Sequence, residues 1–168
     1  MLFRSSVFPS DFASSHPLAG LALQEKIEKR AFAVGGGDYT APAIRMEDFV
    51  ADRAPTPPRS VHPTYPLGTR PVSPHDYLPP VLTDSLRQAI YDFDAWQSGF
   101  YYPDAVLTGA ETRSTSPVRI LRDAEGVSPD LNGLYPVGEG AGYAGGIVSS
   151  AMDGVRAATR YLKKLRKL

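Results

Sequence analysis

The most informative stretch of this sequence joins an expected strand to the last helix, and it runs Leu134-Tyr-Pro-Val-Gly-Glu-Gly-Ala-Gly-Tyr-Ala-Gly-Gly146. Five of the nine residues from 138 to 146 are glycine. Glycine lets a backbone approach a ligand closely, and the first turn of a helix leaves N–H groups unpaired with a partial positive charge. The stretch therefore predicts a site for an anionic or electron-rich group.

The helix that follows is predicted by apolar residues spaced at three and four, namely Ile147, Ala151, Val155, Ala158, Leu162 and Leu165. Gly140, Gly142 and Gly145 match the spacing of a dinucleotide-binding fingerprint, which also requires a following strand and an acidic residue about 20 residues on. At that distance the chain is still in the same helix. The alternative interpretation is that these glycines only allow tight packing of helix on strand.

The preceding sequence predicts two further helices and an irregular segment. Spaced apolar residues indicate a helix after Pro17 that ends at residues 35–37, a short helical turn over residues 46–52, and a helix from Pro80 to before Gly99. Between them, residues 54–80 contain nine prolines, which exclude helix and central strand. We expect a meander attached to a surface by its apolar side chains, with disorder as the alternative; these side chains are Val61, Tyr65, Leu67, Val72, Tyr77 and Leu78.

Three short runs rich in branched residues, 105–108, 118–121 and 134–137, are typical of strands. The predicted fold class is therefore α/β, with segregated and mixed arrangements both open from the pattern alone.

The run from Gly133 to Ile147, with Asp153-Gly154 after it, resembles the C-terminal signature GLYPxGEGAGYAGGI of a large, mostly uncharacterised family of FAD-dependent dehydrogenases. The stretch from Asp104 to Ile120 is similar to a second string of that family. The resemblance implies a fragment of a two-part FAD/NAD(P)-binding Rossmann-like domain plus a helical, proline-rich cap region. Residues 1–102 would be the cap or substrate segment, and residues 103–168 the returning segment of the FAD domain. One departure is Val137, where family members often have cysteine.

The resemblance also implies the roles of particular residues. The FAD-contacting residues would be Gly138, Glu139, Gly140, Ala141, Gly142, Tyr143, Ala144, Gly145, Gly146 and Ile147. Side-chain chemistry, rather than the resemblance alone, indicates the residues next to the substrate or the flavin. The forked donors of Arg113 suit planar anionic groups and the hydroxyls of Ser114, Thr115 and Ser116 can hydrogen-bond a ligand, although loop and turn roles fit them as well. The implied partners are an N-terminal FAD-binding region, a small-molecule substrate, and NAD(P) as a candidate electron donor or acceptor. Without the N-terminal fingerprint, we expect the chain alone to bind FAD weakly or not at all.

Composition narrows the remaining function classes. Eighteen Lys and Arg balance 18 Asp and Glu, so neither nucleic acid nor membrane is expected as a partner. No cysteine is present, and residues 1–12 lack the apolar core of a signal peptide, so we expect a cytoplasmic protein. The three isolated histidines predict no metal site, and no general acid, base or nucleophile is assigned.

Two features of the last helix leave other interpretations open. Its basic end extends from Arg156 to Lys167 and is expected to complement the helix dipole rather than to bind nucleic acid or lipid. Its apolar stripe leaves a second function open, a non-enzymatic interaction module that associates through exposed apolar faces, with a homo-oligomer as one form.

Overall fold

The computed structural model describes residues 6–12 and 14–166. They form two compact units. Unit 1 combines the residues up to Asp11 with Leu23–Thr112, and unit 2 combines Phe12–Ala22 with the residues from Arg113 onward. Lys167, at the end of the basic segment, lies outside the described residues.

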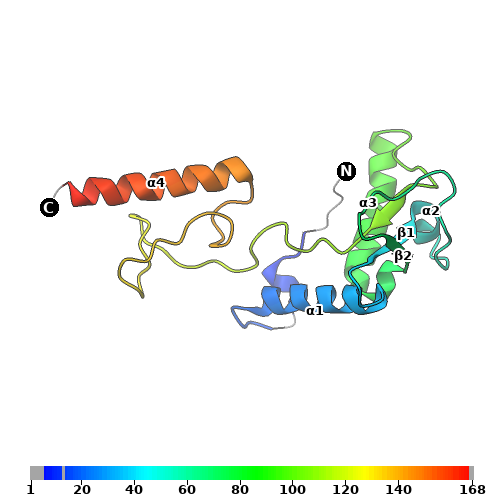
Figure 1. Cartoon of the computed structure of the whole chain (residues 1–168), viewed down its shortest axis with the longest axis horizontal. Helices are drawn as coiled ribbons and strands as arrows, with labels where there is room; N and C mark the ends of the chain where they lie inside the picture. The colour runs from blue at the N-terminus through cyan, green and yellow to red at the C-terminus, as the bar shows by residue number, and fades with distance from the viewer. Residues whose placement is uncertain (1–5, 13, 167–168) are drawn as a thin grey trace. The chain divides into compact units, whose positions relative to one another are not determined.

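Unit 1 is built on a small mixed sheet with the strand order β2-β1-β3. The central strand β1 (Ala41–Arg45) runs parallel to β2 (Thr69–Pro71) and antiparallel to β3 (Val106–Thr108). Helices α1 (Ala19–Val34) and α3 (Pro80–Trp96) run crosswise to each other beside it (Figure 1). Shorter turns complete the order, η1 (Pro9–Asp11), α2 (Met46–Val50) and η2 (Pro74–Asp76). Helices with a mixed sheet confirm the predicted α/β class.

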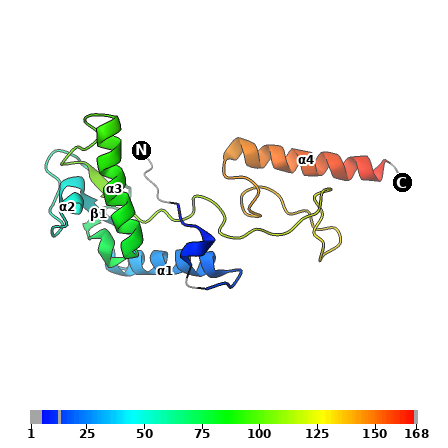
Figure 2. The same cartoon turned by 180° about the vertical axis from the view of Figure 1, so that it is seen from behind.

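Two apolar clusters hold unit 1 together. In one, Ile27 and Ala31 of α1 pack with Val72 and Tyr77. In the other, Ile44, Met46 and Phe49 pack with the fully buried Ile90 of α3. Figure 2, which views the molecule from behind, shows α3 lying across the sheet. Burial of these side chains is the dominant stabilising contribution to this unit.

The predicted helices of this region are confirmed, but the sequence did not indicate the central strand. β1 contains Pro42, and proline is normally excluded from central strands because it cannot donate to the ladder. The structure accommodates Pro42 at the end of the pairing with β3, where its carbonyl accepts from the amide of Gly109 at 3.0 Å. The missing donor therefore falls one position outside the three residues of β1 that pair with β3.

The proline-rich meander is ordered through polar contacts as well as apolar ones. Val72 and Tyr77 are buried as expected, but Tyr65 and Leu67 are 43% and 60% exposed. The carboxylate of Asp104 accepts hydrogen bonds from the amides of residues 59–61 and from the side chain of Arg45. These bonds hold the pKa of Asp104 well below its ordinary value, the hydroxyl of Ser60 contributing most. The network fixes the start of the meander against the sheet.

Unit 2 contains the longest helix, α4 (Ile147–Leu165), as predicted. The expected strands at 118–121 and 134–137 do not form. A strand requires a partner along its length. The run 118–121 has a backbone bond from Ile120 to Ala141 but no neighbouring strand within the described part of the chain. Branched residues alone were insufficient evidence for strand formation here.

The apolar face of α4 is largely exposed. Ile147, Val155 and Leu162 are 93%, 66% and 54% exposed, whereas Ala157 on another face is buried. None of the described helices has the length and apolar character needed to cross a membrane.

Candidate functional site: the glycine-rich turn before α4

The glycine-rich sequence folds as a compact turn that needs glycine at two positions. Gly138 and Gly142 have φ angles of +71° and +81°, a region that other residues rarely adopt. The turn is closed by bonds from the amide of Gly142 to the carbonyl of Glu139 (2.9 Å) and from Tyr143 to Gly138 (3.1 Å). The glycines therefore determine the shape of this backbone.

The preceding segment packs directly against the turn. A Cβ atom on Gly142 would lie 2.5 Å from the carbonyl oxygen of Val118, so only glycine fits this close approach. The hydroxyl of Ser116 donates to Val118 O at 2.9 Å and lies 3.3 Å from Gly140 O. The second string of the sequence resemblance thus forms one wall of the turn.

A partly buried ion pair attaches the turn to α4. Arg122 makes a two-point contact with Asp153, at 2.8 and 2.9 Å, and Asp153 also accepts from the amide of Gly138 at 2.9 Å. These interactions, the bond from Arg122 first, lower the pKa of Asp153 to about 2. The carboxylate therefore stays charged at neutral pH and fixes the distance between turn and helix.

An aromatic ring supports the same arginine. The Arg122 guanidinium lies 3.6 Å from the centre of the Tyr143 ring, with Arg119 at 4.5 Å. The Tyr143 hydroxyl donates to Ile120 O at 3.1 Å, so this predicted cofactor residue is engaged in holding the turn.

The start of α4 is open to solvent. Ser150 donates the first helical bond to the carbonyl of Gly146 at 2.9 Å, so the amides of residues 147–149 precede the helical ladder. The Ser149 hydroxyl caps this end, accepting from the Gly146 amide at 3.1 Å. Ile147 and Val148 are 93% and 72% exposed. Residues 145–149 are all exposed within the described part of the chain, and an exposed helix start is what anion binding there requires.

Two further features suit a bound cofactor. Among the described residues, the Ser150 hydroxyl oxygen is buried without a hydrogen-bond partner. A Cβ on Gly140 would meet nothing within 4 Å, so the backbone there faces open space. Helix amides, an unsatisfied hydroxyl and bare backbone together fit the pyrophosphate and polar edges of FAD. Residues 140–149 would hold such a group, with the half-buried Glu139 beside them.

The predicted substrate-side residues are brought to the turn in part. Ser116 contacts the turn as described, and a Cβ on Gly145 would lie 3.2 Å from the Thr115 methyl group. Arg113 is exposed and Ser114 is half-buried in the same segment. Their roles remain predictions.

Sequence reasoning missed the residues that position the turn. Arg122 was assigned no role, and Asp153 was noted only as part of the family signature. An acid in the second turn of a helix that follows a glycine-rich loop can reach back to a loop amide. That spacing, 15 residues from Gly138, was the available signal.

Comparison with known proteins identifies the family of this chain. A family described as "FAD-dependent protein, C-terminal domain-like" matches residues 5–114, about two-thirds of the chain. The chain belongs to this family. Its matched residues include nearly all of unit 1 and end before the glycine-rich turn, so membership supports a flavoprotein without testing the signature itself.

A relative extends the similarity through unit 2. An uncharacterized protein of Clostridium beijerinckii is 42% identical over 159 residues, which are 95% of this chain and 30% of that protein. The chain therefore spans under a third of the length of the curated relative it matches. This coverage fits a C-terminal part of a larger flavoprotein.

Proposed function

We propose that this chain supplies the second half of the FAD site of a flavin-dependent oxidoreductase, a dehydrogenase. The observation that carries the proposal is the open start of α4, where three amides lie next to glycine backbone held in shape by Arg122 and Asp153. The first half would come from an N-terminal FAD-binding region outside this chain, for which the larger relative has room because the match covers only 30% of it. The chain alone is then a weak binder.

In this proposal the chain's residues bind and orient, and bound FAD supplies the hydride chemistry. The amides of residues 147–149 face the negative charge of the cofactor, and the α4 dipole stabilises it further. A helix start beside the flavin would favour negative charge there and would thereby raise the electron affinity of the site. Arg122 and Asp153 act as positioning residues because they contact the turn rather than a reacting group.

The remaining parts of the proposal follow from the same assignment. The substrate is a small molecule. The segment 113–116 is the proposed substrate- or flavin-adjacent part of unit 2, and residues 1–102 are the proposed cap segment. A nicotinamide nucleotide is a candidate electron donor or acceptor, and the cytoplasm is the proposed location.

A chimera tests the FAD assignment. The chain replaces the matching 159-residue segment of the Clostridium beijerinckii relative, and bound flavin is measured by absorbance after purification. We expect one FAD for each chimera and little FAD on the chain alone. Stoichiometric FAD on the chain alone would contradict the half-site. If the intact relative binds FAD and the chimera is folded but binds none, the whole assignment is contradicted.

A matched pair of substitutions in the chimera locates the cofactor. Gly140→Ala adds a methyl group where no protein atom lies within 4 Å, so the turn itself is not disturbed. If the backbone there approaches FAD, occupancy falls although the fold is intact. The control is Gly154→Ala, which lies within α4 and also has no close neighbours. Gly133 has no close neighbours either, but its φ of +80° would strain an alanine, so it is not used. Unchanged occupancy in both variants would place FAD elsewhere.

The exposed face of α4 supports a second candidate function, an interaction module without catalysis. Ile147, Val155 and Leu162 present an apolar stripe that burial against another polypeptide would stabilise. Light scattering coupled to size-exclusion chromatography of the chain alone tests it. A dimer at micromolar concentration supports this function, and a monodisperse monomer that binds no partner weighs against it.

A further inference from the structure

Unit 2 contains a pocket near the C-terminal end of α4, which we call the α4 pocket. Its volume is about 340 Å³, within the range of about 300–1,000 Å³ typical of small-molecule sites. Arg160, which lines it, follows Ile147 along α4 by about 20 Å at a rise of 1.5 Å per residue. The α4 pocket is therefore separate from the helix start that the FAD proposal uses.

The loop beside the α4 pocket is fixed by its own hydrogen bonds. The Asp123 carboxylate accepts from the amides of Glu125 and Val127, both at 2.9 Å, and the Asp123 amide donates to the Val127 carbonyl at 2.8 Å. Gly126 within this turn has a φ of +87°. A Cβ atom on Gly126 would lie 3.5 Å from a terminal nitrogen of Arg160, so the arginine fork lies next to bare backbone. This side of the pocket is formed before any ligand arrives.

Two tyrosines also line the α4 pocket. Tyr135 comes from the loop and Tyr161 from α4, and their ring centres lie 5.5 Å apart in an edge-to-face arrangement. Tyr135 is half-buried and Tyr161 is 46% exposed. Their contact attaches the loop to the helix, and the exposed part of the rings is available to an organic group.

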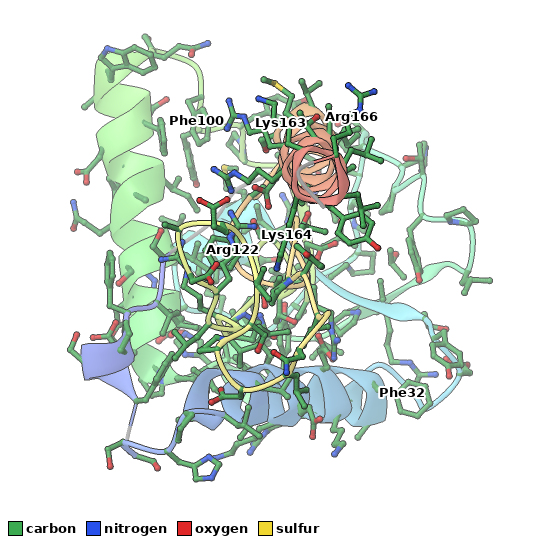
Figure 3. The ribbon with its side chains drawn as sticks, turned by 90° about the vertical axis from the view of Figure 1, so that its left-hand side faces the viewer. Phe32, Phe100, Arg122, Lys163, Lys164 and Arg166 are labelled. Carbon is green, nitrogen blue, oxygen red and sulfur yellow. The ribbon has the colours of Figure 1, made fainter. Side chains whose placement is uncertain are left out.

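Cations dominate the charge of the α4 pocket. Arg160, Lys163 and Lys164 line it, and Figure 3 looks along α4 from its C-terminal end, where the two lysines project from the helix. None of the three forms an ion pair with a residue that the structure describes. Glu125 is the acidic residue of the lining, and the helix dipole adds about half a negative charge at this end. The cations outweigh both, so complementing the dipole does not account for all of them.

We propose that the α4 pocket binds a small phosphate monoester. Such a group carries about 1.5 to 2 negative charges at neutral pH, which matches three cations around one cavity better than a single carboxylate does. The Arg160 fork suits two phosphate oxygens, and Lys163 and Lys164 add point charges. Tyr135 and Tyr161 would contact the organic part of the ligand. The proposal is independent of the FAD assignment, because none of these residues belongs to the segment 138–149.

The test is an amide NMR titration of the full chain at constant ionic strength with AMP, adenosine and inorganic phosphate. We expect saturable AMP shifts near Gly126, Tyr135 and Tyr161, weaker binding of inorganic phosphate and no binding of adenosine. If adenosine or inorganic phosphate binds as tightly as AMP, the phosphate-ester assignment is overturned. Shifts confined to residues 147–149 would place the anion at the helix start and overturn it too, as would the absence of saturable shifts at millimolar AMP.

Two arginine substitutions separate a pocket from a generally basic helix. Arg160→Gln removes a cation of the lining, and we expect AMP affinity to fall about threefold to tenfold. Arg166→Gln changes the net charge equally, at a residue just after α4 that does not line the pocket, and is expected to leave affinity nearly unchanged. Equal affinities of the two variants, reduced or not, would contradict the assignment. The spectra themselves report whether each variant is folded.

A tyrosine pair tests the contact with the organic part. Tyr161→Ala is expected to weaken AMP about twofold to tenfold and to leave inorganic phosphate unchanged. Tyr91→Ala on α3, a tyrosine of similar exposure outside the pocket, is the control and is expected to change neither affinity. An equal loss of both ligands in Tyr161→Ala, or no loss of either, would contradict the ring contact.

Discussion

Units 1 and 2 achieve their structure by different means. Unit 1 has a paired sheet and two apolar clusters, with Phe49 and Ile90 almost completely buried. Unit 2 has a long helix whose apolar face is exposed, and its buried apolar residues in the described part of the chain are Pro136, Ala141 and Ala157. Small buried side chains contribute little transfer free energy, since stabilisation scales with apolar area.

Polar contacts take the place of an apolar core in unit 2. The bond between Arg122 and Asp153, the bond from Gly138 to Asp153 and the close approach of Gly142 to Val118 define its turn. Such contacts specify a geometry but add little stability each. The comparison suggests that unit 1 folds around its own core, whereas unit 2 holds a binding geometry that a further surface would complete.

The largest expected effect is in the core of unit 1. Ile90→Ala removes buried methyl groups and leaves a cavity, so the free energy of unfolding falls by about 2–5 kcal/mol. The matched control is Val81→Ala on the same helix, where 63% exposure limits the change to about 0.5 kcal/mol. Urea unfolding followed by circular dichroism measures both. Equal losses would show that α3 is not the centre of a packed core.

The next effect is in the turn of unit 2. Gly142→Ala forces a residue with a Cβ atom to a φ of +81° and against Val118 O, which we expect to cost about 1–3 kcal/mol. Gly140→Ala has no such conflict and is expected to be neutral or slightly stabilising. Hydrogen exchange of the amides around Tyr143 resolves this local change. Identical exchange in both variants would mean that the turn does not depend on glycine at position 142.

These contrasts also explain what the sequence could predict. Helical spacing in α1, α3 and α4 was sufficient because each helix closes its own hydrogen bonds locally. The central strand β1 was missed because its pairing with β2 and β3 depends on residues up to 65 positions away, and because Pro42 argues against a strand. The run 118–121 shows the opposite error, since branched residues favour a strand only where a partner is present.

The candidate site divides in the same way. The glycine-rich turn and the helix start were predictable because glycine and the orphan amides have intrinsic, local consequences. The roles of Arg122 and Asp153 were not predictable from composition, because their ion pair joins positions 31 residues apart. The Asp104 network was missed for the same reason, since it links the residue two positions before β3 to the meander.

A third prediction uses pH to weaken unit 2 selectively. The pKa of Asp153 is lowered to about 2, so its stabilising contribution is fully present above its unfolded pKa of about 4 and is lost as the pH falls toward 2. Asp153→Asn removes about 1–2 kcal/mol near neutral pH after allowance for partial exposure. Stability of wild type and variant should converge in acid. Urea unfolding at several pH values measures this, with the exposed Asp130→Asn as control; a constant difference down to pH ~2 would exclude the ion pair as its cause.

The smallest expected effect concerns the apolar face of α4. Substitutions there distinguish a face that packs within the chain from a face that only another polypeptide would cover. Val155 is 66% exposed, so Val155→Asp changes the stability of the chain alone by only about 0.5 kcal/mol. Ala157→Asp places a charge at a buried position of the same helix and costs more. In the chimera that tests FAD binding, the α4 face would be covered, and Val155→Asp is then expected to destabilise as Ala157→Asp does. A large loss for Val155→Asp already in the chain alone would show that this face packs within it, and unit 2 would then need no further surface.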